Sequence, residues 1–294
     1  MEAAQVEAYN DLKQGERGAW TSIVAYIALT VLKLGIGYRA GSEALTADGL
    51  NNATDLIASV AVLIGLRISR KPPDSDHPYG HFRAETIAAL IASFIMFAVG
   101  IQVFIQAISS FTGPKLEAPG MLAAWVALLC AAIMYGVYIY NIRLARKINN
   151  KALLAAAYDN RSDAFVSLAA FAGIIGARLG LPWLDPVAAV LVSLLICKTA
   201  WGIFIDAAHA LTDGFDDKKL ALYKQTIAGT PGVEAIEDVR ARVHGNQVLL
   251  DVVIVVDHQL TVAQSHDIAE DVEQRMLRKH KVGHVHVHVE PTPM

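Results

Sequence analysis

Long apolar stretches alternate with short polar ones over most of this chain. Six of the stretches are long enough to cross a bilayer, which takes about 20 helical residues. They are expected near residues 20–38, 45–66, 85–111, 121–142, 153–177 and 183–205. Most of them lack the polar face that a helix in a soluble bundle needs. The pattern therefore predicts an all-α transmembrane bundle of six helices over residues 19–212.

The pattern changes after Asp213, where the elements become short and carry charge on one face. Residues 216–228 and 262–279 have the period of amphipathic helices, whereas 236–243, 248–256 and 284–289 alternate or run apolar like strands. Gly245-Asn246 is typical of the turn between the first two strands. The order helix, strand, strand, helix, strand predicts a small α+β domain at residues 213–294, with an antiparallel-containing sheet packed against two helices.

Lysine and arginine, which favour the cytoplasmic side of a membrane, are unevenly shared between the connecting segments. The connections after the second and fourth stretches hold most of them: Arg67, Arg70, Lys71, Arg83, Arg143, Arg146, Lys147 and Lys151. The connections on the other side hold one each: Arg39, Lys115 and Arg178. With a polar segment at residues 1–18 ahead of the first stretch, both termini are expected in the cytoplasm.

Composition narrows the class of protein. The chain is 54% apolar and only 18% charged, which is unusual for a soluble protein. A formal net charge of -3 leaves no basic excess for binding nucleic acid, so no nucleic-acid partner is expected. The two cysteines, Cys130 and Cys197, both lie in apolar stretches. They are expected to be small buried hydrophobes and not part of a disulfide framework or a thiolate zinc site.

Two polar steps interrupt the apolar stretches, one in the second stretch and one in the fifth. On helices Asn51 and Asp55 share one face, as do Asp159 and Asp163, because residues four apart lie one turn above another. The first pair lies near the centre of its stretch, and the second lies roughly 12 to 18 Å along the helix from Lys151 at about 1.5 Å per residue. The two pairs are therefore expected to face each other at similar depth.

These four residues offer three carboxylates and one amide carbonyl, with no sulfur and no imidazole. Ionisable residues inside a membrane span are rare and indicate function by default. Hard oxygen ligands suit Mn²⁺ or Mg²⁺ better than Zn²⁺, which usually takes His or Cys. We predict a transport site for a divalent metal ion at Asn51, Asp55, Asp159 and Asp163, with Mn²⁺ preferred, Zn²⁺, Fe²⁺ or Co²⁺ able to bind, and no organic cofactor.

The same carboxylates suggest how transport is coupled. Three adjacent carboxylates away from bulk water do not all stay ionised, so at least one is expected to take up a proton when no metal is bound. Metal entry would expel protons and metal release would readmit them. This predicts metal/proton antiport, provided that the site opens alternately to the two sides. A structural alternative is an internal ion pair between Asp48, which shares the face of Asn51, and Arg161.

Two further segments extend the pattern: HPYGHFRAE at residues 77–85 and VHVEP at residues 287–291. Together with the six stretches and the paired polar steps, they resemble the cation diffusion facilitator family over nearly the whole chain. The resemblance implies a homodimeric exporter of divalent cations in exchange for protons, with a cytoplasmic αββαβ domain of the ferredoxin-like, copper-chaperone-like type. Zinc-handling members have His where Asp159 stands and His or Asp where Asn51 stands. This chain instead resembles the manganese-exporting branch.

The resemblance also implies two other metal sites and an ion pair. A second cation site would lie in the cytoplasmic loop, where imidazoles could hold Zn²⁺, and a regulatory site would lie in the C-terminal domain. The loop residues are Asp74, His77 and His81, and the C-terminal residues are His266, His288 and Glu290. The C-terminal site is incomplete, because Glu237 and Val253 replace two of its usual histidines. Solvated histidines remain the alternative at both places. Arg83 and Asp213 match the positions of a charge interlock in the family.

Several functions remain open on the residues alone. Within transporters the runner-up is an exporter of Zn²⁺, Fe²⁺ or Co²⁺. From another class, the chain could be a membrane metal sensor whose histidine-rich end reports occupancy to a partner. An intramembrane hydrolase could use paired aspartates as general acid and base, but the chain has no recognisable nucleophile motif. The sequence therefore predicts an exporter in a bacterial cell membrane and not an enzyme.

Overall fold

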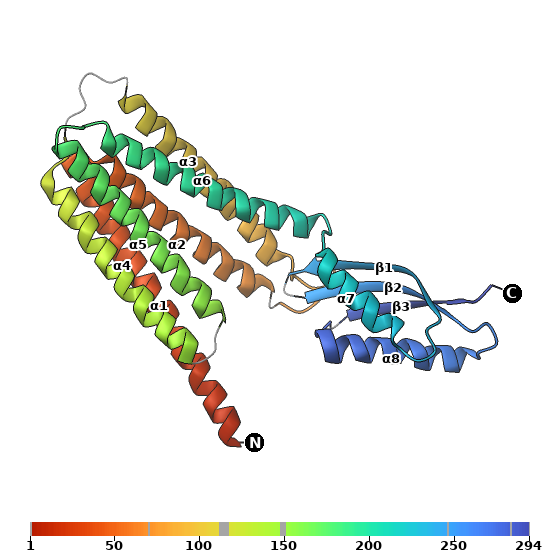
Figure 1. The fold of residues 1–294 in the computed structure, drawn as a ribbon. Helices are drawn as coiled ribbons and strands as arrows, with labels where there is room; N and C mark the ends of the chain where they lie inside the picture. The colour runs from red at the N-terminus through yellow and green to blue at the C-terminus, as the bar shows by residue number, and fades with distance from the viewer. Residues whose placement is uncertain are drawn as a thin grey trace. The chain divides into compact units, whose positions relative to one another are not determined.

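Six long helices make up the first part of the chain (Figure 1). The computed structural model describes residues 2–69, 71–111, 118–147, 151–245, 247–282 and 284–293. The helices are α1 (Glu2–Ala40), α2 (Glu43–Ser69), α3 (Ala84–Ser110), α4 (Met121–Lys147), α5 (Lys151–Arg178) and α6 (Leu184–Leu211). Each spans all or nearly all of one of the six apolar stretches, and α1 continues back through the polar N-terminal segment.

Four of these helices are long and apolar enough to cross a membrane. They are α1 from Trp20 onward, α3, α4 and α6, among the residues that the structure describes. The other two, α2 and α5, carry the polar steps within their apolar stretches. The prediction of a helical transmembrane domain is therefore confirmed.

The chain divides into two compact units. The first consists of Met1–Val60 and Ala92–Trp201, and the second of Ala61–Ile91 and Gly202–Met294. Small residues fill much of the core of the first unit, where Ala123, Ala127 and Cys130 of α4 pack beside Leu29 of α1 and Ile174 of α5. Small side chains let membrane helices approach closely. Cys130 is buried and Cys197 partly buried, both as free thiols, in agreement with the expectation of small hydrophobes.

The second unit contains a three-stranded sheet with two helices. Its elements are α7 (Asp217–Ala228), β1 (Ala235–His244), β2 (Gln247–Val256), α8 (Val262–His280) and β3 (His284–Pro291). The sheet order is β1-β2-β3, with β1 antiparallel and β3 parallel to β2. Helix α7 packs against β1 and α8, and α8 packs against β3 (Figure 1). The α+β prediction is confirmed.

Local sequence explains where these shorter helices begin. The Asp216 side chain caps α7 by accepting hydrogen bonds from the backbone N–H groups of Lys218 and Lys219. Thr261 and Gln264 form a capping box at the start of α8. Gly245 has φ +62 at the turn after β1, a conformation that favours glycine. Asn246, the other residue predicted for this turn, lies outside the described residues.

Candidate metal centre

The polar steps of α2 and α5 meet inside the first unit. Asn51 and Asp163 are each only 6% exposed. The Asn51 amide nitrogen donates hydrogen bonds to Asp163 Oδ1 at 3.1 Å and to Asp55 Oδ2 at 3.3 Å. One amide therefore bridges two carboxylates from different helices. The structure brings together three of the four side chains that the sequence singled out.

Helix α1 adds a residue that the sequence analysis missed. The Tyr26 hydroxyl donates a hydrogen bond of 2.5 Å to Asp163 Oδ2. Both oxygens of Asp163 thus accept a hydrogen bond, one from α1 and one from α2. A tyrosine in an apolar stretch gives no sign of its partner, because the contact joins residues far apart in the sequence.

Asp159 stands apart from the other three. It lies one turn before Asp163 on α5 and is exposed. It interacts electrostatically with Asp55 and Asp163 but makes no hydrogen bond among the described residues. Three carboxylates repel one another, and only two of them here share the bridging amide of Asn51. The predicted facing of the two helices is present, but the full four-residue cluster does not converge.

A buried ion pair lies beside this cluster. Lys33 Nζ of α1 is 2.9 Å from Asp48 Oδ1 of α2 and donates a second hydrogen bond of 2.9 Å to Ser167 Oγ of α5. Asp48 therefore pairs with Lys33 and not with Arg161, so the ion pair considered from the sequence is wrong. The Arg161 guanidinium instead lies over the rings of Tyr158 and Tyr138, at 4.9 and 5.8 Å from their centres.

A second buried polar group joins α1, α4 and α5. The amide nitrogens of Asn141 and Asn160 donate to Ser22 Oγ at 2.8 and 3.1 Å. The side-chain oxygens of both asparagines are buried and have no hydrogen-bond partner among the described residues. Asn160 follows Asp159 directly, so its polarity extends the cluster along α5 toward the helix start.

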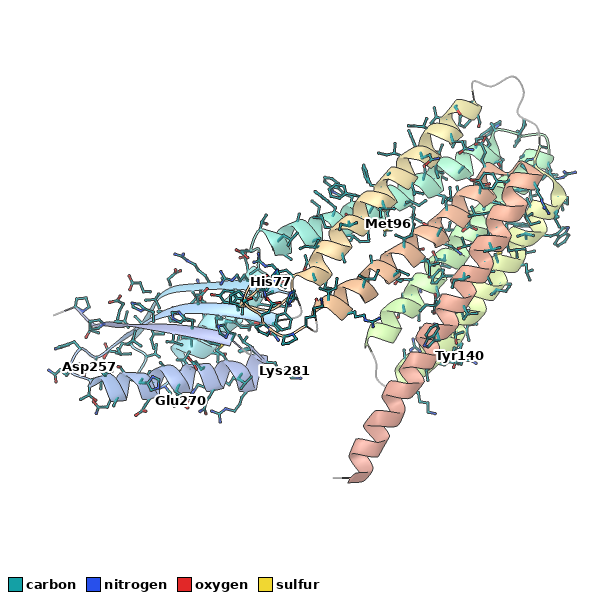
Figure 2. The ribbon with its side chains drawn as sticks, turned by 180° about the vertical axis from the view of Figure 1, so that it is seen from behind. His77, Met96, Tyr140, Asp257, Glu270 and Lys281 are labelled. Carbon is teal, nitrogen blue, oxygen red and sulfur yellow. The ribbon has the colours of Figure 1, made fainter. Side chains whose placement is uncertain are left out.

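The loop after α2 brings together the three residues predicted for a second cation site, of which His77 is labelled in Figure 2. Asp74, His77 and His81 have ligand atoms that all lie within 4.8 Å of one another, the one such group of three or more His, Cys, Asp or Glu side chains in the described part of the chain. His77 Nδ1 lies 3.3 Å from Asp74 Oδ1, and His81 Nε2 lies 3.5 Å from Asp74 Oδ2. The turn is closed by the His77 backbone N–H, which donates to Asp74 at 2.8 Å and lowers the pKa of that carboxyl.

The end of the same loop pairs with residues after α6, all within the second unit. Arg83 Nη2 lies 2.5 Å from Asp213 Oδ1, with side chains 37% and 51% exposed. The His244 ring at the end of β1 lies 5.7 Å from the ring of Phe82. Partial burial, and next the nearby charge of Arg83, lower the pKa of His244.

The C-terminal candidates are only partly assembled. His288 Nε2 lies 2.8 Å from Glu290 Oε1 on β3. His266 is exposed on α8 and does not join them in a three-ligand group among the described residues. His284, His286 and His288 are all exposed and alternate with partly buried valines, so they share one face of the strand.

Comparisons with known proteins agree with this architecture. The family model of the cation efflux transmembrane domain matches residues 19–212, and that of the cytoplasmic domain of cation efflux proteins matches residues 215–292. Manganese efflux system protein MneS of Bacillus subtilis (strain 168) is 57% identical over 286 residues, which are 97% of this chain and 99% of that protein. Manganese efflux system protein MneP of the same organism is 37% identical over 283 residues, which are 93% of this chain and 95% of that protein.

One solved structure among the matches is a variant of the C-terminal domain of MamM. It is 26% identical, covers 26% of this chain and 100% of that chain, and gives a TM-score of 0.25.

Proposed function

This chain belongs to the cation efflux family and is a metal cation exporter, and we propose that its cargo is Mn²⁺, moved out of the cytoplasm in exchange for protons. The observation that carries this proposal is the cluster in which the Asn51 amide bridges the carboxylates of Asp55 and Asp163, side chains that offer a metal ion only oxygen ligands. Hard oxygen ligands favour Mn²⁺ over metals such as Zn²⁺ that prefer imidazole or thiolate ligands. The names of two similar proteins, both manganese efflux system proteins, support the same cargo.

Binding of Mn²⁺ would use Asp55, Asp159, Asp163 and the amide oxygen of Asn51. The Asn51 amide donates to carboxylates through its nitrogen, so its oxygen becomes a ligand when the amide turns over. The exposed Asp159 would close onto the ion, because a divalent charge removes the repulsion that separates it from the other carboxylates. The protons held by the carboxylates would leave as the ion enters, and alternating access would release the ion on the far side.

The proposed topology has six membrane spans, with α2 and α5 crossing beside the four apolar helices. Residues 1–18 would form a cytoplasmic segment, residues 19–212 the transmembrane domain and residues 213–294 a cytoplasmic domain that dimerises. Both termini would be cytoplasmic in a bacterial cell membrane, following the excess of Lys and Arg in the loops after α2 and α4.

The other candidate residues take supporting roles in this proposal. Asp74, His77 and His81 would hold a second cation that stiffens the loop. Arg83 and Asp213 would act as the charge interlock. The C-terminal site would be formed by His266, His288 and Glu290. Because His266 does not join the other two within one chain, it would be supplied by a second copy of the chain.

Counterflow in reconstituted vesicles tests the cargo and the coupling together. Wild-type protein is expected to move Mn²⁺ in preference to Zn²⁺, Fe²⁺ and Co²⁺, and to release protons as it does so. Asp159→Ala should abolish both fluxes, whereas Asp206→Asn, which neutralises an exposed aspartate on α6, should leave them unchanged. Unchanged Mn²⁺ flux in Asp159→Ala would sink the assigned site. A membrane sensor, the alternative from another class, would move no metal across the sealed vesicle.

A further inference from the structure

Lys33 is the least expected residue in the first unit. It is 0% exposed, although it lies in the middle of an apolar helix. A lysine within the membrane is costly unless it is paired or serves a function. Gly49 explains how it fits, because a Cβ at that position would lie 3.0 Å from Lys33 Cβ and 2.9 Å from a methyl group of Leu34. Helices α1 and α2 therefore approach closely where the ammonium meets Asp48.

The ammonium belongs to a group of buried polar side chains, here called the Lys33 group: it contacts Asp48 and Ser167, and Asn52 lies one turn after Asp48 on α2. Asp48, Asn52 and Ser167 are each 0% exposed. Lys33 satisfies Asp48 Oδ1 and Ser167 Oγ. Asp48 Oδ2 and both polar atoms of Asn52 have no hydrogen-bond partner among the described residues. Unpartnered polar atoms in a buried position are costly, so the two oxygens, Asp48 Oδ2 and Asn52 Oδ1, could bind a further cation.

The Lys33 group is built from the same three helices as the transport site. In the transport site, α1 contributes Tyr26, α2 contributes Asn51 and Asp55, and α5 contributes Asp163. In the Lys33 group, the same helices contribute Lys33, then Asp48 and Asn52, then Ser167. Along α5, Ser167 lies one turn beyond Asp163, which is about 6 Å of rise.

We infer that Asp48, Asn52 and Ser167 form a second cation site next to the transport site, in which the Lys33 ammonium is a tethered occupant that excludes Mn²⁺. This rests on the proposed function, since it places the second site on the outward path of the transported ion. While Lys33 is paired, its charge opposes movement of Mn²⁺ past Asp55 and Asp163. When α1 moves away during outward opening, Asp48 offers its oxygens to the departing ion.

The groups that surround the ammonium fit this role. Lys33 interacts electrostatically with Asp55 of α2, with Asp163 of α5 and with the Cys130 thiol of α4. Asp48 faces it directly. The ammonium thus pairs with Asp48 and also acts electrostatically on the carboxylates of the transport site, so the charge at one site influences the other.

The test is the number of Mn²⁺ ions bound per chain, measured by equilibrium dialysis on the full-length protein at one fixed pH. Lys33→Met removes the tethered occupant and should bind one Mn²⁺ more than wild type. Lys33→Met combined with Asp48→Asn should return to the wild-type number. Lys33→Arg, which keeps the charge, and Lys198→Met, which removes an exposed lysine from α6, should also match wild type.

An equal number of ions in folded Lys33→Met and wild type would overturn the inference. If Lys33→Met unfolds without metal, the same idea predicts that Mn²⁺ raises its unfolding temperature more than that of wild type or of the double variant. No larger rise would equally overturn it. Because binding at equilibrium needs no transport, the result is separate from the vesicle assay, in which failure of wild type to move Mn²⁺ would refute the proposed function instead.

Discussion

Replacing Asp163 by asparagine separates the charge of the proposed transport site from its hydrogen bonds. In wild type, Asp163 accepts from Asn51 on one oxygen and from Tyr26 on the other. An asparagine can keep both contacts, because its oxygen accepts from Asn51 and its nitrogen donates to the tyrosine oxygen, which has free lone pairs. Asp163→Asn is therefore expected to unfold at nearly the wild-type temperature while losing affinity for Mn²⁺.

The size of that loss follows from the missing charge. One carboxylate charge and the double charge of Mn²⁺, 4 Å apart, attract by about 8 kcal/mol at an effective dielectric constant of about 20. Part of this attraction is offset, because the carboxylate must lose its proton or break its hydrogen bonds before it binds the ion. The net loss of binding free energy is therefore about 2–4 kcal/mol. At about 1.4 kcal/mol per factor of ten, Mn²⁺ affinity should fall by about 30-fold to 1000-fold.

Calorimetric titration of Mn²⁺ gives the affinity, in a background in which Asp74, His77 and His81 are alanine so that the loop does not contribute. Asp163→Ala serves as the contrasting variant. It leaves the Asn51 and Tyr26 donors without their acceptor, so it should lose both affinity and about 1–3 kcal/mol of stability for each buried unpaired group. If the affinity of Asp163→Asn for Mn²⁺ stays within about threefold of the wild-type affinity, well below the tenfold change that 1.4 kcal/mol produces, the reasoning is refuted.

Three further outcomes are expected. Asp159→His places an imidazole among the oxygens and should raise the Zn²⁺ to Mn²⁺ transport ratio in vesicle counterflow, and an unaltered ratio would place selectivity elsewhere. Arg83→Ala should change the free energy of unfolding by at most about 1 kcal/mol, since the pair with Asp213 is exposed, yet weaken dimerisation measured by sedimentation; equal dimerisation in variant and wild type would remove the interlock role. The pKa of His244 is lowered in the folded protein, so its stabilising contribution is present above the unfolded-state pKa and is lost as the pH falls through the folded-state pKa. His244→Phe should therefore show a smaller drop in unfolding temperature than wild type on acidification below about pH 6.5. Parallel curves of unfolding temperature against pH for the two proteins would contradict this.

Periodicity and composition predicted the elements of this chain well. The period with which apolar and polar residues alternate indicates whether a segment is a helix or a strand and where it ends. The predicted segments at residues 216–228 and 248–256 therefore nearly match α7 and β2. The pairing of Asn51 with Asp55 could also be predicted, because a spacing of four is a local property of a helix.

Contacts between helices were harder to predict. Tyr26 and Lys33 reach Asp163 and Asp48, but nothing in the apolar stretch of α1 shows which way these side chains point. The choice of Lys33 over Arg161 as the partner of Asp48 depends on the close approach of α1 at Gly49, which is a packing detail. The placement of Asp159 outside the hydrogen-bonded cluster could not be predicted either, since a shared helix face does not decide whether like charges converge or separate.

The chemistry of Asn51 links these contacts to the proposed transport of Mn²⁺. A carboxylate at this position would add a fourth negative charge and could only accept hydrogen bonds from its neighbours. A histidine would favour a softer ion. The amide has a donor end, which holds Asp55 and Asp163 together, and an acceptor end, which can face a metal ion after a single side-chain rotation. The carboxylates therefore stay close in the absence of a cation. Under the proposed antiport, the same residue would add a neutral oxygen ligand without increasing the number of protons that each ion has to displace.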